Sequence, residues 1–284
     1  MRDQFYIVLP SNSSMQYFPE NTTSHFVTKL PKEVQLHGDW TVALTEIQIP
    51  LTFLHLTNDV LERTVLVEMA TTTQNFKTDE FVDITGLEFQ SEEECFVNPG
   101  VYRNIDSLVE EINNLESVKS HLRLRIERGG FVKISRTCNS NQCTARLHKL
   151  ELSEKIWKIL GVVDNKRAYS NGKAYIMIKD DEPVTGERPA NLAESLPNML
   201  MVYGNLLEPY VTGDVQTRLL RAVSLDIHEY NFGLTKVKAF SPAMYLPLLF
   251  NSFQAVEIDI RDQMGQPLPF THGTLTITLH FRRA

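Results

Sequence analysis

Alternation of apolar and polar residues with a period of two is the sequence feature that most constrains how this chain folds. In the most regular run, residues 274–281, threonine and histidine alternate with leucine, isoleucine and phenylalanine, and residues 256–260 alternate valine and isoleucine with acidic residues. Residues 65–69 show the same pattern less regularly. Because successive side chains of a β-strand point to opposite faces, these runs predict antiparallel strands that each bury one face.

A change of phase interrupts the pattern between residues 40 and 49. The apolar residues up to Leu44 share one parity and those from Ile47 onward share the other, so the pattern slips at Thr45 and Glu46. A β-bulge absorbs such a slip by adding one residue on one strand. We therefore predict one bulged strand over 40–49.

Further strand candidates lie at 5–9, 25–30, 174–178, 199–206 and 218–225. Most proline and glycine residues fall between the runs, where they set turns without breaking a central ladder. Many strands joined by long loops are typical of a β-sandwich or barrel, and the predicted class is mainly β.

The middle of the chain has a different pattern. Asn104 is a typical N-cap residue, and the apolar residues of 105–115 recur at helical spacing. Alternation in 122–126 and 132–134, on either side of a Gly-Gly turn, predicts a hairpin.

A second helix is predicted to begin after Ser153, its N-cap, and to stop at Gly161 in the left-handed conformation. The helix–hairpin–helix segment is therefore expected to be an insertion into the β-domain. The predicted domains are a sandwich formed by 1–93 and 198–284, an inserted α+β subdomain at 94–172, and a return strand and linker at 173–197.

Charge and composition argue against several classes of protein. The net charge is −7, from 28 basic and 35 acidic residues without a long run of either sign, so we expect no direct binding to nucleic acid. No stretch approaches about eighteen apolar residues and the N-terminus lacks a signal-peptide pattern, so we expect no membrane span and no classical secretion. The odd, sparse set of three cysteines fits a reducing compartment without a disulfide framework.

Motifs that carry catalysis are missing from the sequence, which has no Gly-x-Ser-x-Gly, Walker A, His-Glu-x-x-His or Rossmann glycine pattern. We therefore expect no enzyme activity, no catalytic residue and no cofactor. Cys138, Cys143 and His148 have spacings that a metal site uses. Zinc sites have a tighter cysteine pair and a fourth ligand, so no metal site is predicted.

Two further groups of residues have both a functional and a structural interpretation. Asp259, Arg261 and Asp262 resemble paired catalytic carboxylates, but acid–base pairs need a pocket, so a salt bridge or turn cap is favoured. Trp40 and Trp157 are candidate platforms for ligand stacking. Their register with apolar neighbours favours packing in a core.

The loop 239–252 is more apolar than a solvated loop requires. It is either a buried crossover between sheets or a subunit contact, because exposed apolar surface marks interfaces. A second candidate contact lies at 208–214. Together these segments supply the predicted subunit-interface residues Tyr210, Tyr245, Leu248 and Phe250.

Both ends of the chain carry the motifs of one family. The N-terminal motifs are Leu-Pro-Ser-Asn-Ser-Ser at 9–14, Phe-Pro-Glu-Asn-Thr at 18–22, Gly-Asp-Trp at 38–40 and Val-Ala-Leu-Thr-Glu-Ile at 42–47. The C-terminal motifs are Tyr-Leu-Pro-Leu at 245–248, Val-Glu-Ile-Asp-Ile-Arg-Asp at 256–262 and Leu-His-Phe-Arg-Arg at 279–283. With these motifs the chain resembles the penton (minor capsid) proteins of Polinton/Maverick elements and of adintovirus-like and virophage genomes.

The resemblance implies a single jelly roll of eight strands in two facing sheets, five copies of which form the vertex of an icosahedral capsid. It also implies a double jelly-roll major capsid protein as partner, a place in the virion capsid, and synthesis in the host cell cytoplasm. A chain of 284 residues is too short for two jelly rolls with their loops, which favours the vertex protein. A rival interpretation is a β-sandwich binding module that recognises a glycan or a host receptor.

Overall fold

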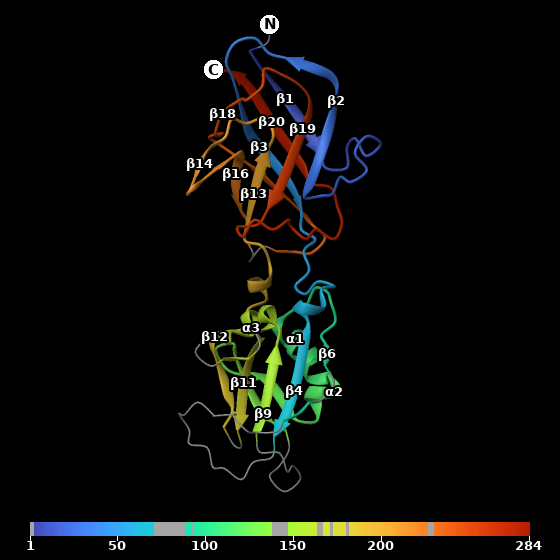
Figure 1. Cartoon of the computed structure of the whole chain (residues 1–284), viewed down its shortest axis with the longest axis vertical. Coiled ribbons are helices and arrows are strands. Elements are labelled where there is room, and N and C mark those ends of the chain that lie inside the picture. Colours follow the sequence, from blue (N-terminus) through green and yellow to red (C-terminus); the bar gives the residue numbers. More distant parts are fainter. Residues whose placement is uncertain are drawn as a thin grey trace. The chain divides into compact units, whose positions relative to one another are not determined.

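A computed structural model describes residues 3–70, 89–91, 94–137, 147–163, 167–170, 173–179, 182–226 and 230–284. The chain forms two compact units (Figure 1). Met1–Phe53 and Pro197–Ala284 build the first, called the terminal unit, and Leu54–Leu196 builds the second, called the central unit. Both are mainly β, with antiparallel sheets. No helix in the described ranges is long and apolar enough to cross a membrane.

The first sheet of the terminal unit has four principal strands. In spatial order they are β1 (Gln4–Pro10), β20 (Thr276–Arg283), β3 (Trp40–Pro50) and β17 (Thr235–Ala239). The short β18 (Leu246–Pro247) pairs with β3 at the same edge as β17, because β20 occupies the other side of β3. β1 and β17 are therefore at opposite edges of this sheet.

The second sheet of the terminal unit also has four strands. In spatial order they are β16 (Leu219–Ser224), β13 (Met199–Gly204), β19 (Ser252–Arg261) and β2 (His25–Gln35). A separate hairpin is formed by β14 (Tyr210–Thr212) and β15 (Val215–Thr217).

The two sheets of the terminal unit pack face to face as a sandwich. Phe253 of β19 stacks on Phe281 of β20, with ring centroids 5.7 Å apart. Full burial of a ring such as that of Phe281 stabilises the fold by roughly 1.5–3 kcal/mol. Trp40 is buried as well, and its indole N–H donates to the carbonyl of His37 at 3.2 Å. The predicted core position of this tryptophan is confirmed.

The predicted bulge is present in β3. Thr278 of β20 lies opposite Glu46, whereas the next residue, Leu279, lies opposite Leu44. Thr45 is the extra residue, and its hydroxyl donates to the carbonyl of Thr278 at 3.1 Å. The bulge corrects the phase, so the apolar residues on both sides of it remain buried.

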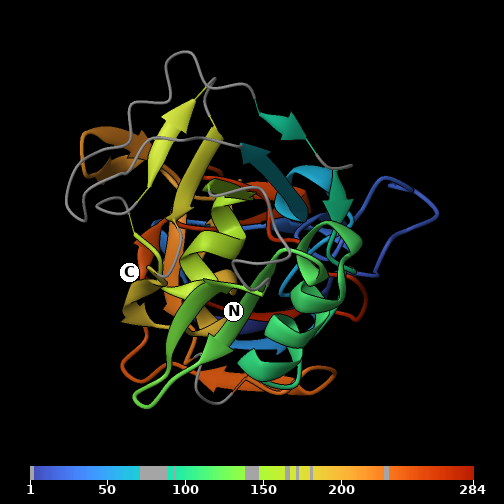
Figure 2. The same cartoon turned by 90° about the horizontal axis from the view of Figure 1, so that it is seen from below.

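The described part of the central unit contains three α-helices and two sheets. The helices are α1 (Ile105–Asn114), α2 (Glu116–Lys119) and α3 (Glu154–Leu160), and the 3-10 turns are η1 (Val60–Glu62) and η3 (Leu192–Ser195). The larger sheet contains β10 (Ala168–Ser170), β11 (Lys173–Lys179), β9 (Leu147–Leu152), β4 (Thr64–Ala70), β5 (Gln90–Ser91) and β6 (Cys95–Phe96). The smaller sheet contains β12 (Val184–Pro189), β8 (Phe131–Arg136) and β7 (Leu122–Ile126). Buried side chains from α1, α3 and both sheets form one core. Figure 2 shows the ribbon of the chain from below.

The predicted signals for helix ends and for the hairpin are confirmed. The side chain of Asn104 accepts from the N–H of Ser107 at 2.9 Å where α1 begins. The hydroxyl of Ser153 accepts from the N–H of Ile156 at 3.2 Å where α3 begins. Gly161 follows the end of α3 with a φ of 71°, a left-handed conformation that glycine adopts without steric cost. β7 and β8 form the predicted hairpin.

The boundaries of the two units differ from the predicted ones. The sequence assigns 1–93 to the sandwich, but β4, which contains 65–69, pairs with β9 inside the central unit. The sequence assigns 173–197 to a return strand and linker, but β11 pairs with β9, and β12 pairs with β8. Alternation identifies a strand without identifying the sheet that it joins, so the central unit is larger than the expected insertion at 94–172.

Candidate functional site

The residues predicted at a subunit interface lie in different surroundings. Phe250 is 48% exposed, as a surface contact requires. Leu248 is only 8% exposed and forms a β-bridge with Leu207, so it belongs to the core of the terminal unit and is not a surface contact. Tyr210 is half-buried, and its hydroxyl donates to the carbonyl of Leu219 at 2.7 Å. The loop 239–252 therefore combines a buried part with an exposed part.

Tyr245 joins an aromatic cluster on the outward face of the first sheet. Its hydroxyl lies 2.6 Å from Nδ1 of His280, and the guanidinium carbon of Arg282 lies 3.5 Å from the centre of its ring. The ring of Tyr6 stacks on His280, with centroids 4.2 Å apart. Burial, together with the charge of Arg282, lowers the pKa of His280. Because the pKa is lowered, the histidine is neutral at pH 7. The stacked rings of Tyr6 and His280 hold one another in place.

Beside this cluster, the edge strand β1 presents apolar side chains to the outside. Tyr6 is 61% exposed and Val8 is 57% exposed. β1 contains no charged residue, whereas β2, β16 and β17, the principal strands at the other three edges of the sandwich, each contain at least one. Charges on an edge strand discourage pairing with another chain, and exposed apolar side chains mark contacts. Tyr6, Val8, Tyr245 and Arg282 are called the candidate contact surface, and the buried His280 supports the rings of Tyr6 and Tyr245.

Sequence reasoning missed Tyr6 and Val8, although a signal was present. Residues 5–9 are apolar at every position, so the strand is apolar on both of its faces. An antiparallel strand with one solvated face shows alternation instead. A run of this kind therefore indicates either burial on both faces or an exposed apolar face, and the structure shows the second.

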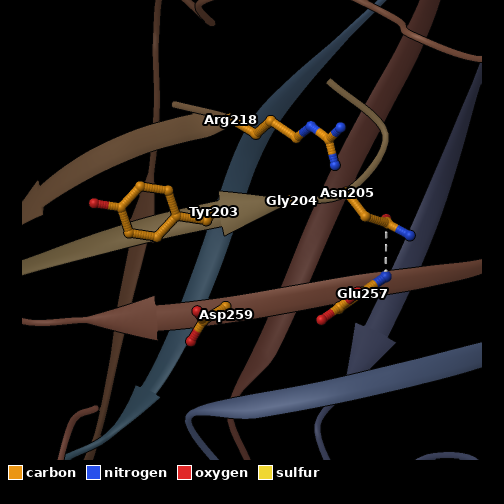
Figure 3. A pocket seen from close by; sticks show the side chains of 6 residues that line it. All are labelled: Tyr203, Gly204, Asn205, Arg218, Glu257 and Asp259. Carbon is orange, nitrogen blue, oxygen red and sulfur yellow. Dashed lines mark hydrogen bonds between the residues drawn. The ribbon is translucent and has the colours of Figure 1, made fainter. Parts of the chain in front are cut away.

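A shallow pocket lies on the outward face of the second sheet of the terminal unit (Figure 3). Its volume is about 160 Å³, and it is lined by aromatic, cationic, amide and acidic side chains around one glycine. The lining residues are Tyr203, Gly204, Asn205, Arg218, Glu257 and Asp259. Tyr203 and Asp259 lie opposite each other on β13 and β19, and Arg218 directly precedes β16, so three adjacent strands meet at the pocket.

Three polar side chains of the pocket each have a hydrogen-bond or ion-pair partner within the terminal unit. Oδ1 of Asn205 accepts from the N–H of Glu257 at 3.0 Å. Oε1 of Glu257 lies 2.9 Å from Nε2 of His25, and Oδ2 of Asp259 accepts from Nε of Arg261 at 2.7 Å. Amide and carboxylate groups have further capacity, here at Nδ2 of Asn205 and at the second oxygen of each carboxylate.

The charged residues near the end of β19 have the structural roles favoured by the sequence. Asp259 and Arg261 form an ion pair at 2.7 Å. Oδ1 of Asp262 accepts from the N–H groups of Met264 and Gln266, both at 2.8 Å. The predicted salt bridge and turn cap are both confirmed.

The remaining candidates are the cysteine and histidine residues with metal-site spacing and the second tryptophan. Cys138 and Cys143 lie outside the described residues, and His148 is fully buried. Within the described ranges, no group of three or more His, Cys, Asp or Glu residues is placed to hold a metal ion. Trp157 is fully buried, with its indole N–H donating to the carbonyl of Ala174 at 3.2 Å, which confirms that it packs in a core.

The geometry defines an antiparallel β-sandwich joined to a mixed central unit, and a viral capsid protein has a similar fold. No family model and no curated protein matches the sequence. Among solved structures, the crystal structure of the mavirus penton protein is similar, with a TM-score of 0.52 and 9% sequence identity. The similarity covers 99% of this chain and 100% of that one. The chain therefore has a penton-like fold.

Proposed function

We propose that this chain is a structural, non-enzymatic capsid protein that forms the pentameric vertex of an icosahedral particle. The observation that carries the proposal is the similarity to the mavirus penton protein, which extends over the whole length of both chains. The motifs at both ends of the sequence, which resemble those of Polinton/Maverick pentons, support the same assignment.

The strand order of the terminal unit supports a single jelly roll. Its eight principal strands, in chain order, are β1, β2, β3, β13, β16, β17, β19 and β20. The first sheet contains the first, eighth, third and sixth of these, and the second sheet contains the second, seventh, fourth and fifth. Two Greek keys folded into a jelly roll interleave their strands in this way. The central unit joins the third strand to the fourth, as an inserted subdomain does.

A ring of five copies requires heterologous contacts, in which one surface of each copy complements a different surface of the next. The candidate contact surface at the β1 edge supplies one side of such a contact. At the opposite edge of the same sheet, the exposed Leu234 and Val237 offer the other side. We propose a double jelly-roll major capsid protein as the further partner, the virion capsid as the location, and the host cell cytoplasm as the place of synthesis.

Native mass spectrometry of the purified chain, across protein concentration and salt, tests this proposal. A dominant species of five subunits supports it, and a stable trimer or a monomer under all conditions contradicts it. Val8→Lys and Phe250→Asp place a charge at exposed apolar positions, so we expect each to reduce the oligomer without changing the melting temperature. Met264→Lys is the control, because Met264 is 77% exposed and lies outside the candidate contact surface. An oligomer that persists in both variants removes these positions from the interface.

A further inference from the structure

The pocket of Figure 3 combines groups that packing within the terminal unit does not require. A guanidinium, an amide and two carboxylates lie around the backbone of Gly204, and the ring of Tyr203 lies on the same side of the pocket as Asp259. We propose that this pocket binds a neutral saccharide. The proposal goes beyond a structural role in the capsid and does not depend on it.

The charges of the lining select the class of ligand. Glu257 and Asp259 repel an anion, and Arg218 repels a cation. A neutral ligand that both donates and accepts hydrogen bonds avoids both penalties. Saccharide hydroxyl groups do both: they donate to carboxylate oxygens and accept from guanidinium and amide N–H groups. Hydrogen bonds to these ionised partners are roughly twice as strong as those between neutral groups.

Tyr203 provides the apolar part of the proposed saccharide site. Tyr203 lies directly opposite Asp259 in the sheet, so an apolar ring face and a carboxylate are available to the same ligand. A sugar ring has an apolar C–H face together with hydroxyl groups at its rim. The ring of Tyr203 provides apolar area for that face, and the carboxylate of Asp259 provides an acceptor for a hydroxyl group at the rim.

Three of the four polar side chains already have a partner within the protein before a ligand arrives. Asn205 is held by the backbone N–H of Glu257, Glu257 by His25, and Asp259 by Arg261. Groups that are already ordered lose little conformational freedom on binding, which favours affinity.

The size of the pocket limits what enters. Its volume of about 160 Å³ is below the roughly 300–1,000 Å³ of pockets that enclose drug-sized ligands, so it accepts a single sugar ring. With one ring and a shallow site, we expect weak binding, with a Kd of about 1 mM. Several copies on one particle raise the effective affinity for a surface that carries many glycans.

Saturation-transfer NMR on the full chain tests the proposal, with methyl glycosides of neutral hexoses as probes and methyl glycosides of acidic sugars for comparison. We expect transfer to at least one probe, with a Kd that rises about tenfold in Asp259→Asn and in Tyr203→Ala, the equivalent of about 1.4 kcal/mol for each. Glu46→Gln is the matched control, because Glu46 is a carboxylate of β3 on the other sheet, and it should leave the Kd unchanged. Melting temperatures establish that each variant is folded.

Three results overturn the inference. One is the absence of transfer to every neutral probe at concentrations well above the expected Kd. Another is transfer that Asp259→Asn and Tyr203→Ala leave unchanged, which places the ligand elsewhere. The third is transfer to acidic sugars alone, which contradicts the ligand class. The readout is independent of oligomeric state, so failure here and failure of the vertex proposal are distinguishable.

Discussion

Acid is expected to destabilise the central unit through two buried histidines. His148 is fully buried, and neither of its ring nitrogens has a hydrogen-bond partner among the described residues. Burial, together with the nearby Arg136 and His121, lowers its pKa from 6.5 to about 4. Burial and the charge of Lys155 also lower the pKa of His55 to about 4.

The sign of the effect follows from proton binding. Above pH 6.5 both histidines are neutral in the folded and in the unfolded chain. Below pH 6.5 the unfolded chain binds a proton at each, whereas the folded chain does so only near pH 4. The free energy of unfolding of the central unit therefore falls between these values, by about 2 kcal/mol for each histidine at about pH 5.

The positions of the two tryptophans allow the free energy of unfolding of the central unit to be measured separately. Trp157 lies in the central unit and Trp40 in the terminal unit, so a Trp40→Phe background confines the tryptophan fluorescence to the central unit. Urea unfolding at neutral and at acid pH then gives the change in free energy. His148→Leu in the same background removes one titrating group and should lose about half of that change. A free energy that does not depend on pH, or a full change that persists in His148→Leu, would refute the reasoning.

Two substitutions, one in each unit, test packing by urea unfolding. Phe281→Ala removes a fully buried ring that stacks on Phe253, and we expect it to destabilise the terminal unit by about 3–5 kcal/mol. A loss below about 1 kcal/mol would contradict the core position of this ring. Gly161→Ala places a Cβ 2.1 Å from the carbonyl oxygen of Arg188, so we expect a loss of more than about 1 kcal/mol. Gly213→Ala also has a positive φ but meets no atom within 4 Å, and an equal loss there would contradict the role of the close contact.

Local chemistry made much of the fold predictable. The N-caps at Asn104 and Ser153 and the bulge at Thr45 each depend on residues close in the chain. Sheet membership depends instead on distant partners, and alternation alone placed β4 in the wrong sheet. β17 was missed because Lys236 and Lys238 occupy the positions opposite Ile49 and Ile47, where alternation requires apolar residues.

The candidate sites were less predictable than the fold. Phe250 was predicted as a contact because an apolar side chain in a loop is conspicuous in a sequence, and the structure shows only that this side chain is exposed. The pocket was not identified, because its residues come from β13 and the residue after it, from β19 and from the position before β16, and no motif spans them. Tyr203 and Asp259 become neighbours only through the pairing of two strands that are far apart in the chain.

The position of β20 determines when the terminal unit is completed during synthesis. β20 is the last strand of the chain, yet it lies between β1 and β3 and is the partner of β1 in the sheet. The central unit, Leu54–Leu196, leaves the ribosome earlier, with its own partners already present. On the ribosome the central unit is therefore expected to fold first, and the terminal unit is expected to be completed when β20 pairs with β1 and β3. The candidate contact surface combines β1 with side chains of β20, so it forms only at that step.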